Sequence, residues 1–146
     1  HDITKETGKA AQLEIIKYAG VELHPFDKRG DKFLHQASGS AMAKILGIED
    51  EEILDAIRYH TTGKANMTML EQIIYLADFI SAVYQISNVH RDYKDIDIIR
   101  KETQRGIEYG LLYGTAYTIK SVASRQILLH PMTVEAYNWI IDEYFN

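Results

Sequence analysis

Apolar residues recur along this chain at the three- and four-residue spacing of helices, and no stretch shows the alternation expected of a strand. Helices are predicted over residues 10–19, 33–46 and 50–59, and Gly20 and Gly47 stand where a helix-ending glycine belongs. A fourth helix begins after Thr68, because Thr68 and Glu71 have the spacing of a capping box. We expect a loop over 82–94 and then a long helical region over 95–124 with one break. The last helix is predicted over 133–145, with Thr133 as its N-cap, which gives an all-α chain of about six helices.

The fourth helix is apolar nearly all round, so we expect it to be central in the bundle. Its inner face is predicted to be formed by Leu70, Ile73, Ile74 and Ala77, widened by Leu76, Phe79 and Ile80. Downstream, three glycines repeat every four residues, at Gly106, Gly110 and Gly114. With charged residues close by, this repeat predicts a close helix–helix contact inside a soluble bundle rather than membrane pairing.

The composition narrows the class of protein. The chain has 146 residues, 46% of them hydrophobic, which predicts one globular domain over residues 1–146. A formal net charge of −5 argues against a nucleic-acid-binding surface. There is no cysteine, which excludes disulfides, thiolate metal sites and cysteine nucleophiles. No apolar run is long enough for a membrane span and nothing resembles a signal peptide, so we expect a cytoplasmic protein.

Five residues could together bind a metal ion. His1 and Asp2 form a His-Asp dyad, and Asp78 is an acid inside the most apolar helix. A buried carboxylate needs a cation or donors, so Asp78 either binds a metal or pairs with a Lys or Arg. His35 lies within the second helix and His60 follows the third, where each is either a ligand or a hydrogen-bonded core histidine. Imidazoles and carboxylates from separate helices form an N/O ligand set that suits iron, manganese or another divalent ion.

The order of these residues resembles a known family. His1-Asp2-Ile3-Thr4-Lys5-Glu6 is followed by Leu34-His35, by the stretch Ala56–Gly63 reading AIRYHTTG, and by Tyr75–Ile80 reading YLADFI. This order, with the later Leu129–Thr133 segment, is similar to the HD-domain symmetrical bis(5′-nucleosyl)-tetraphosphatases of the YqeK type, which belong to the HD-domain metal phosphohydrolases. The resemblance implies an HD-domain helical bundle. It also implies an enzyme that splits diadenosine tetraphosphate into two ADP by attack of a metal-bound hydroxide.

The resemblance also implies a ligand assignment. His1, Asp2 and Asp78 would hold one ion together with a histidine that the family carries on a helix some tens of residues before the dyad. Asp2 would bridge to a second ion, which His35 and His60 complete. Because the sequence lacks that histidine, we expect N-terminal helices to precede this stretch. Iron is the expected metal, with manganese as the alternative.

Substrate contacts are expected close to these ligands. Asp2 and Lys5, three residues apart, are the expected catalytic pair, with Lys5 neutralising a phosphate oxygen if both lie on one helical turn. The hydroxyl and N–H groups of Thr61, Thr62 and Gly63 would hold phosphate, or would simply end the helix.

Two arginines and one histidine leave alternatives open. Arg58 is either a phosphate contact or the partner of Asp55, and Arg91 is the equivalent of the family's loop arginine. His130 precedes the last helix and has either a structural role or a place at the edge of the nucleotide pocket.

Two other functions remain open from the sequence. The chain could be an HD phosphohydrolase acting on a nucleoside monophosphate, a deoxynucleotide or a guanosine alarmone. It could also be a non-catalytic HD domain that binds a nucleotide as a sensor, although the complete ligand set argues against this. The expected partner is a nucleotide substrate, with neither nucleic acid nor membrane, and a homodimer is compatible with the sequence.

Overall fold

The computed structural model describes residues 1–81 and 93–146. In these two ranges the chain forms seven α-helices, one short 3₁₀ helix and no strand, which confirms the all-α prediction. The elements are, in chain order, α1 (Lys9–Ala19), η1 (Asp27–Arg29), α2 (Asp31–Ile45), α3 (Glu51–Arg58), α4 (Met69–Ser81), α5 (Tyr93–Thr103), α6 (Ile107–Ser124) and α7 (Pro131–Tyr144). The predicted break in the long helical region separates α5 from α6. Most of the loop predicted over 82–94 lies outside the described residues, and positions 93 and 94 belong to α5.

Local signals set several helix ends. The capping box of α4 is formed as predicted, because the Thr68 N–H donates to Glu71 Oε2 at 2.6 Å and the Glu71 N–H donates to Thr68 Oγ1 at 3.3 Å. Gly20 ends α1 in the left-handed conformation, with φ of 67°. These contacts join residues close in sequence, which is why the pattern alone could predict them.

The N-cap predicted for α7 is wrong. The helix begins at Pro131, and His130 is its N-cap, with Nδ1 accepting a hydrogen bond from the Met132 N–H at 3.2 Å. Proline suits the first helical position because its missing N–H would be unpaired there in any case. Thr133 lies inside the first turn and is buried.

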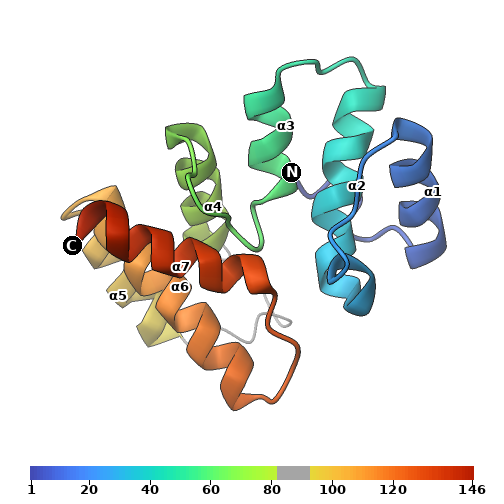
Figure 1. Ribbon diagram of the computed structural model, residues 1–146. Coiled ribbons are helices and arrows are strands. Elements are labelled where there is room, and N and C mark those ends of the chain that lie inside the picture. The colour runs from blue at the N-terminus through green and yellow to red at the C-terminus, as the bar shows by residue number, and fades with distance from the viewer. Residues whose placement is uncertain (82–92) are drawn as a thin grey trace.

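The helices pack around two apolar cores (Figure 1). Helices α1, α2 and α3 lie beside one another and bury Ile16, Leu34, Ala37 and Ala41 between α1 and α2. Helices α4 to α7 surround the second core, formed by Met67, Tyr75, Leu76, Phe79, Ile99, Leu111 and Ile140. Helix α4 contacts α3 on one side and α6 on the other, so it joins the two halves. The N-terminus is drawn at the lower end of α3, on the side that faces α2 (Figure 1).

The face that α4 buries includes the predicted Leu76 and Phe79 but not the predicted Ile73 and Ala77. Ile73 is 47% exposed and Ala77 is also exposed, whereas Tyr75, Leu76 and Phe79 are buried. Because the helix is apolar on every side, its pattern did not distinguish the inner face. The glycine prediction is confirmed: a Cβ at Gly110 would lie 3.1 Å from Leu76 Cδ1, so the missing side chain lets α4 and α6 approach closely.

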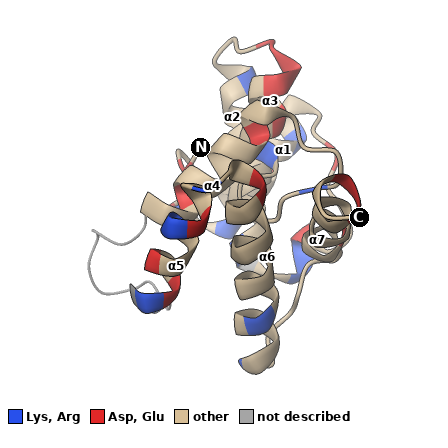
Figure 2. Cartoon of the chain, turned by 90° about the vertical axis from the view of Figure 1, so that its left-hand side faces the viewer, with Lys and Arg blue, Asp and Glu red and all other residues tan. Residues whose placement is uncertain are grey.

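In the view of Figure 2, Lys and Arg are scattered over the helices, and acidic residues gather at the start of α3, where residues 49–52 are all Asp or Glu. None of the helices in the described part of the chain is both long and apolar enough to cross a membrane.

Candidate metal centre

The His1-Asp2 dyad is held against α2 by a short folded segment. Residues 2–7 form two consecutive turns rather than the helix on which Lys5 was expected to neighbour Asp2. Thr4 fixes these turns, because its buried Oγ1 lies 2.6 Å from Ser38 Oγ and donates to the His35 carbonyl at 3.1 Å. Gly39 allows the close approach, since a Cβ there would lie 2.7 Å from the His1 carbonyl oxygen.

All five predicted ligands come together. Asp2 Oδ1 lies 3.5 Å from His35 Nε2 and 3.4 Å from His60 Nε2, and these two nitrogens are 3.1 Å apart. On the other side, His1 Nε2 lies 3.1 Å from Asp78 Oδ1 and 3.7 Å from Asp2 Oδ2. The two oxygens of Asp2 therefore face two groups of ligands, His35 with His60 and His1 with Asp78.

Three polar atoms of this cluster converge, namely Asp2 Oδ1, His35 Nε2 and His60 Nε2. His60 Nδ1 lies 2.7 Å from the Ile57 carbonyl, which can only accept, so Nδ1 carries the ring proton and Nε2 has a lone pair. His35 Nε2 lies 3.1 Å from this nitrogen and 3.2 Å from Thr61 Oγ1, whose hydroxyl can donate to it. Burial lowers the pKa of both histidines, so both rings are neutral. Asp2 Oδ1 is buried and has no hydrogen-bond donor among the described residues.

A divalent cation fits this arrangement. Converging lone pairs repel one another unless a positive charge lies between them. Ligand atoms about 2.1 Å from an ion lie about 3.0–3.4 Å from each other in octahedral or tetrahedral geometry, close to the observed spacings. A backbone carbonyl that accepts the other ring proton is also the usual support of a histidine ligand. His1, Asp2 and His60 also offer ligand atoms that all lie within 4.8 Å of one another.

Lys5 contacts the cluster from its exposed side. Its Nζ donates to Asp2 Oδ2 at 2.7 Å, and the Lys5 side chain is 50% exposed. Burial raises the pKa of Asp2, whereas the hydrogen bond and the charge of Lys5 lower it. The lowering is the larger effect, so the pKa of Asp2 lies below its usual value. Asp2 is therefore an anion at neutral pH, as a metal ligand must be.

The Thr61–Gly63 stretch has mixed roles. Thr61 Oγ1 lies 3.2 Å from His35 Nε2, so this residue belongs to the cluster. Thr62 is buried and donates to the Gly63 carbonyl at 3.0 Å. Gly63 has a φ of 65°, and a Cβ there would lie 3.1 Å from Ala136 Cβ. The structure thus brings Thr61 to the cluster, whereas Thr62 and Gly63 shape the turn behind it.

Arg58 is a buried structural residue. Its Nη2 donates to Asp27 Oδ2 at 2.5 Å, and Asp27 is fully buried on η1. His130 Nε2 lies 3.3 Å from Asp27 Oδ1, so three elements meet at this carboxylate. The alternative pairing of Arg58 with Asp55 is wrong. His130 has structural contacts and also lines the cavity described below, so the structure does not choose between its two predicted roles. Arg91 lies outside the described residues.

Lys64, rather than Arg58, forms the ion pair with Asp55. Lys64 Nζ lies 2.9 Å from Asp55 Oδ2 and 2.9 Å from Glu71 Oε1. Lys64, in the turn after α3, therefore links Asp55 of α3 to Glu71 of α4.

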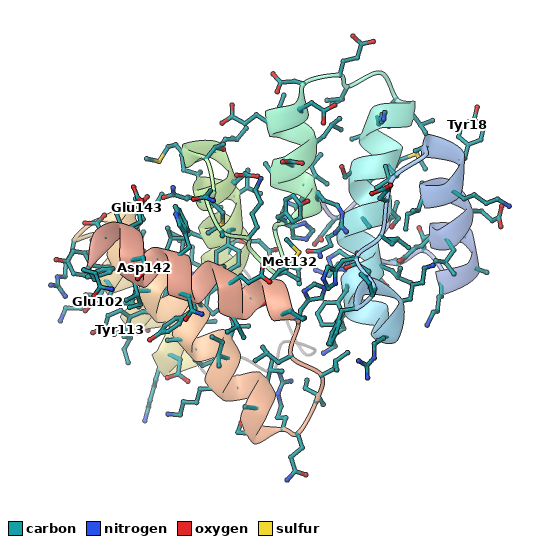
Figure 3. All side chains as sticks on the ribbon, in the orientation of Figure 1. Tyr18, Glu102, Tyr113, Met132, Asp142 and Glu143 are labelled. Atoms are coloured by element: carbon teal, nitrogen blue, oxygen red, sulfur yellow. The ribbon has the colours of Figure 1, made fainter. Side chains whose placement is uncertain are left out.

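A cavity of about 590 Å³ opens beside the cluster. His35, His60, Thr61, Asp78 and Lys5 lie at one end, and residues that were not predicted form the rest, among them Lys32, Phe33, Tyr117, Ser121 and Arg125. The cavity reaches the start of α7, marked by Met132 in Figure 3, where the Phe33 and His130 rings are 4.9 Å apart. The four-residue spacing of Tyr117, Ser121 and Arg125 shows that they share one face of α6, but sequence alone does not show what that face meets.

The chain has relatives among known proteins. No family model matches it. It is 29% identical over 141 residues to "Bis(5'-nucleosyl)-tetraphosphatase, symmetrical" of Bacillus subtilis, which covers 97% of this chain and 72% of that protein. It is 32% identical over 136 residues to the protein of the same name from Halalkalibacterium halodurans, covering 92% of this chain and 63% of that protein, which is less than two thirds of its length.

A solved structure shows the family. The crystal structure described as a predicted HD superfamily hydrolase involved in NAD metabolism, from Clostridium acetobutylicum, superimposes with a TM-score of 0.84. It is 38% identical in sequence, and the match covers 97% of this chain and 72% of that one. Together with the His-Asp cluster, this identity and coverage show that the chain belongs to the HD superfamily of hydrolases.

Proposed function

We propose that this protein is a metal-dependent hydrolase that splits diadenosine tetraphosphate symmetrically into two ADP. The observation that carries the metal dependence is the convergence of His35 Nε2 and His60 Nε2 on Asp2 Oδ1, a buried oxygen with no hydrogen-bond donor among the described residues. The substrate rests on the two curated relatives, both named symmetrical bis(5′-nucleosyl)-tetraphosphatases. A hydrolase of this kind would act in the cytoplasm, where such nucleotides occur.

The two faces of Asp2 support a two-ion site. One ion would be held by His1, Asp2 and Asp78, and the other by Asp2, His35 and His60. The nitrogen and oxygen ligands suit iron, with manganese as the alternative. Two such ions would supply an activated water and offset the negative charge of the phosphates.

The protein's own residues would orient the substrate. A polyphosphate approaching a chain of net charge −5 needs local positive charge, and Lys5 offers it beside Asp2. Its half-exposed ammonium would donate to a non-bridging phosphate oxygen, and the Thr61 hydroxyl would contact a second one. The oxygen of water bonds to the second phosphorus counted from one adenosine. The bond from that phosphorus to the central bridging oxygen breaks, and this oxygen leaves with the other ADP.

Product analysis tests this function. Purified protein loaded anaerobically with ferrous or manganous ion is given diadenosine tetraphosphate, a nucleoside monophosphate, a deoxynucleotide and a guanosine tetraphosphate in separate assays. We expect ADP as the sole product of the first, and loss of turnover on chelation and in the Asp78→Asn variant. Asp142→Asn, on the exposed side of α7, is the control and should keep the wild-type rate.

Three results would contradict the proposal. Equal amounts of AMP and ATP would refute symmetrical cleavage. Turnover of another nucleotide alone would indicate a different HD phosphohydrolase. Absence of turnover on every nucleotide by metal-loaded protein would indicate a nucleotide-binding domain without catalysis.

A further inference from the structure

The cavity extends well beyond the metal cluster along one face of α6. At its inner end the Tyr117 ring packs edge-on against Phe79, the neighbour of Asp78, with the ring centroids 5.7 Å apart. Ser121 and Arg125 follow at four-residue intervals and also line the cavity. Eight residues of helix rise about 12 Å, so this wall is about 12 Å long from Tyr117 to Arg125.

The opposite wall is formed where the chain turns back after α6. Gln126 has a φ of 54°, its N–H donates to the Ala123 carbonyl, and the Ile127 N–H donates to the Val122 carbonyl. This pair of bonds is a Schellman motif, which reverses the chain direction at a helix end. The connection then returns toward α2 (Figure 1), and residues 127–129 line the cavity.

The lining is mostly apolar and carries three basic residues. Aromatic and aliphatic side chains supply most of it, namely Phe33, Phe79, Tyr117, Val122, Leu128 and Leu129. Lys5, Lys32 and Arg125 also line it, whereas Asp78 is its one acidic residue among those described. Ile127 is 43% exposed at the wall, which leaves apolar surface open to a ligand. An apolar slot with three cations, in a chain of net charge −5, favours an anionic ligand that has an apolar, planar part.

We infer that the stretch between Tyr117 and Arg125 binds the base and ribose of one nucleoside of the substrate, with its phosphates directed to the cluster. Apolar side chains would cover the faces of the base, and the Arg125 guanidinium would pack against it at the outer end. The Ser121 hydroxyl lies in the middle of the wall, where a larger side chain would occupy the space of the nucleoside. The inference rests on the proposed function only in taking the cluster as the place where phosphates bind.

Two ligands separate the nucleoside contribution from the phosphate contribution. Binding of ADP and of inorganic tripolyphosphate to manganese-loaded protein is measured by calorimetry for wild type and for Ser121→Leu and Arg125→Ala. Each variant should bind ADP about tenfold more weakly, because leucine would fill the slot and alanine would remove the guanidinium that packs against the base. Binding of tripolyphosphate should stay within twofold of wild type.

Matched controls come from the same helix end. Ser124→Leu and Lys120→Ala change exposed residues that do not line the cavity, so both should bind ADP as wild type does. Circular dichroism establishes that each variant is folded, and Arg125→Ala still tests the inference if Ser121→Leu is not. Equal ADP affinity in Arg125→Ala and Lys120→Ala, or equal losses for ADP and tripolyphosphate, would overturn the inference. Because binding is measured without turnover, the outcome does not depend on whether diadenosine tetraphosphate is cleaved.

Discussion

Replacing Arg58 with alanine should affect stability far more than catalysis. Arg58 is 7% exposed, and its guanidinium pairs with the fully buried Asp27, which also faces His130. Removing one partner leaves a buried carboxylate without its charge partner. Such losses cost about 3–5 kcal/mol, a large fraction of the about 5–15 kcal/mol by which a domain is stable.

Urea denaturation measures this loss directly. The midpoint of Arg58→Ala should fall while the dependence of unfolding free energy on urea stays unchanged, because the surface exposed on unfolding is the same. Lys5→Ala is the comparison, since Lys5 is half exposed and lies at the cluster. It should lose less than about 1 kcal/mol of stability but most of its turnover. A stable Arg58→Ala with a raised KM would refute the structural role and restore the phosphate contact.

The stability lost in Arg58→Ala should also depend on pH. Burial raises the pKa of Asp27, but hydrogen bonds and charge from His130 and Arg58 lower it more, so its folded pKa lies below the usual 3.8. A lowered folded pKa contributes stability above pH 3.8 that is lost as the pH falls through the folded value. The difference in stability between wild type and Arg58→Ala should therefore narrow below pH 3.8. A difference that stays constant from pH 7 to pH 3 would contradict this explanation.

Three further changes test local features by urea denaturation. Thr68→Ala removes the capping box of α4 and should cost about 1 kcal/mol, and an unchanged midpoint would argue against the cap. Gln126→Gly should gain up to about 1 kcal/mol, because glycine adopts its left-handed conformation without strain, whereas a loss would show that the side chain matters more. Burial lowers the pKa of Lys64, but Glu71 and Asp55 raise it more, to a net value above 10.5. Wild-type stability should therefore fall as the pH rises past 10.5, and Lys64→Met should remove that decrease.

The sequence predicted most of the helices, and it identified five candidate ligands that the structure brings together, for different reasons. Helix starts and ends depend on residues three or four apart, as in the Thr68–Glu71 box, so they can be found from the pattern. The ligands could be proposed because histidines and acids among apolar neighbours need partners, and because their order resembles a family. The spacing of 25 residues between His35 and His60 does not itself show that their nitrogens meet.

What the sequence could not provide depends on contacts between distant elements. Arg58 and Asp27 are 31 residues apart, and no local signal identifies them as a pair. The cap of α7 was assigned to Thr133 because threonine is a common cap, whereas His130 acts through a ring nitrogen. The cavity wall on α6 required knowing which face of that helix lines the cavity.

The central claim is that Asp2 is shared by two metal ions, and metal content tests it most directly. Protein reconstituted anaerobically with ferrous or manganous ion, then freed of excess, is analysed by mass spectrometry for ions per chain. We predict about two ions per chain in wild type and about one in His35→Ala and in His60→Ala. Folded Asp2→Ala should bind none. Wild-type metal content in Asp2→Ala, or unchanged content in the two histidine variants, would contradict the account.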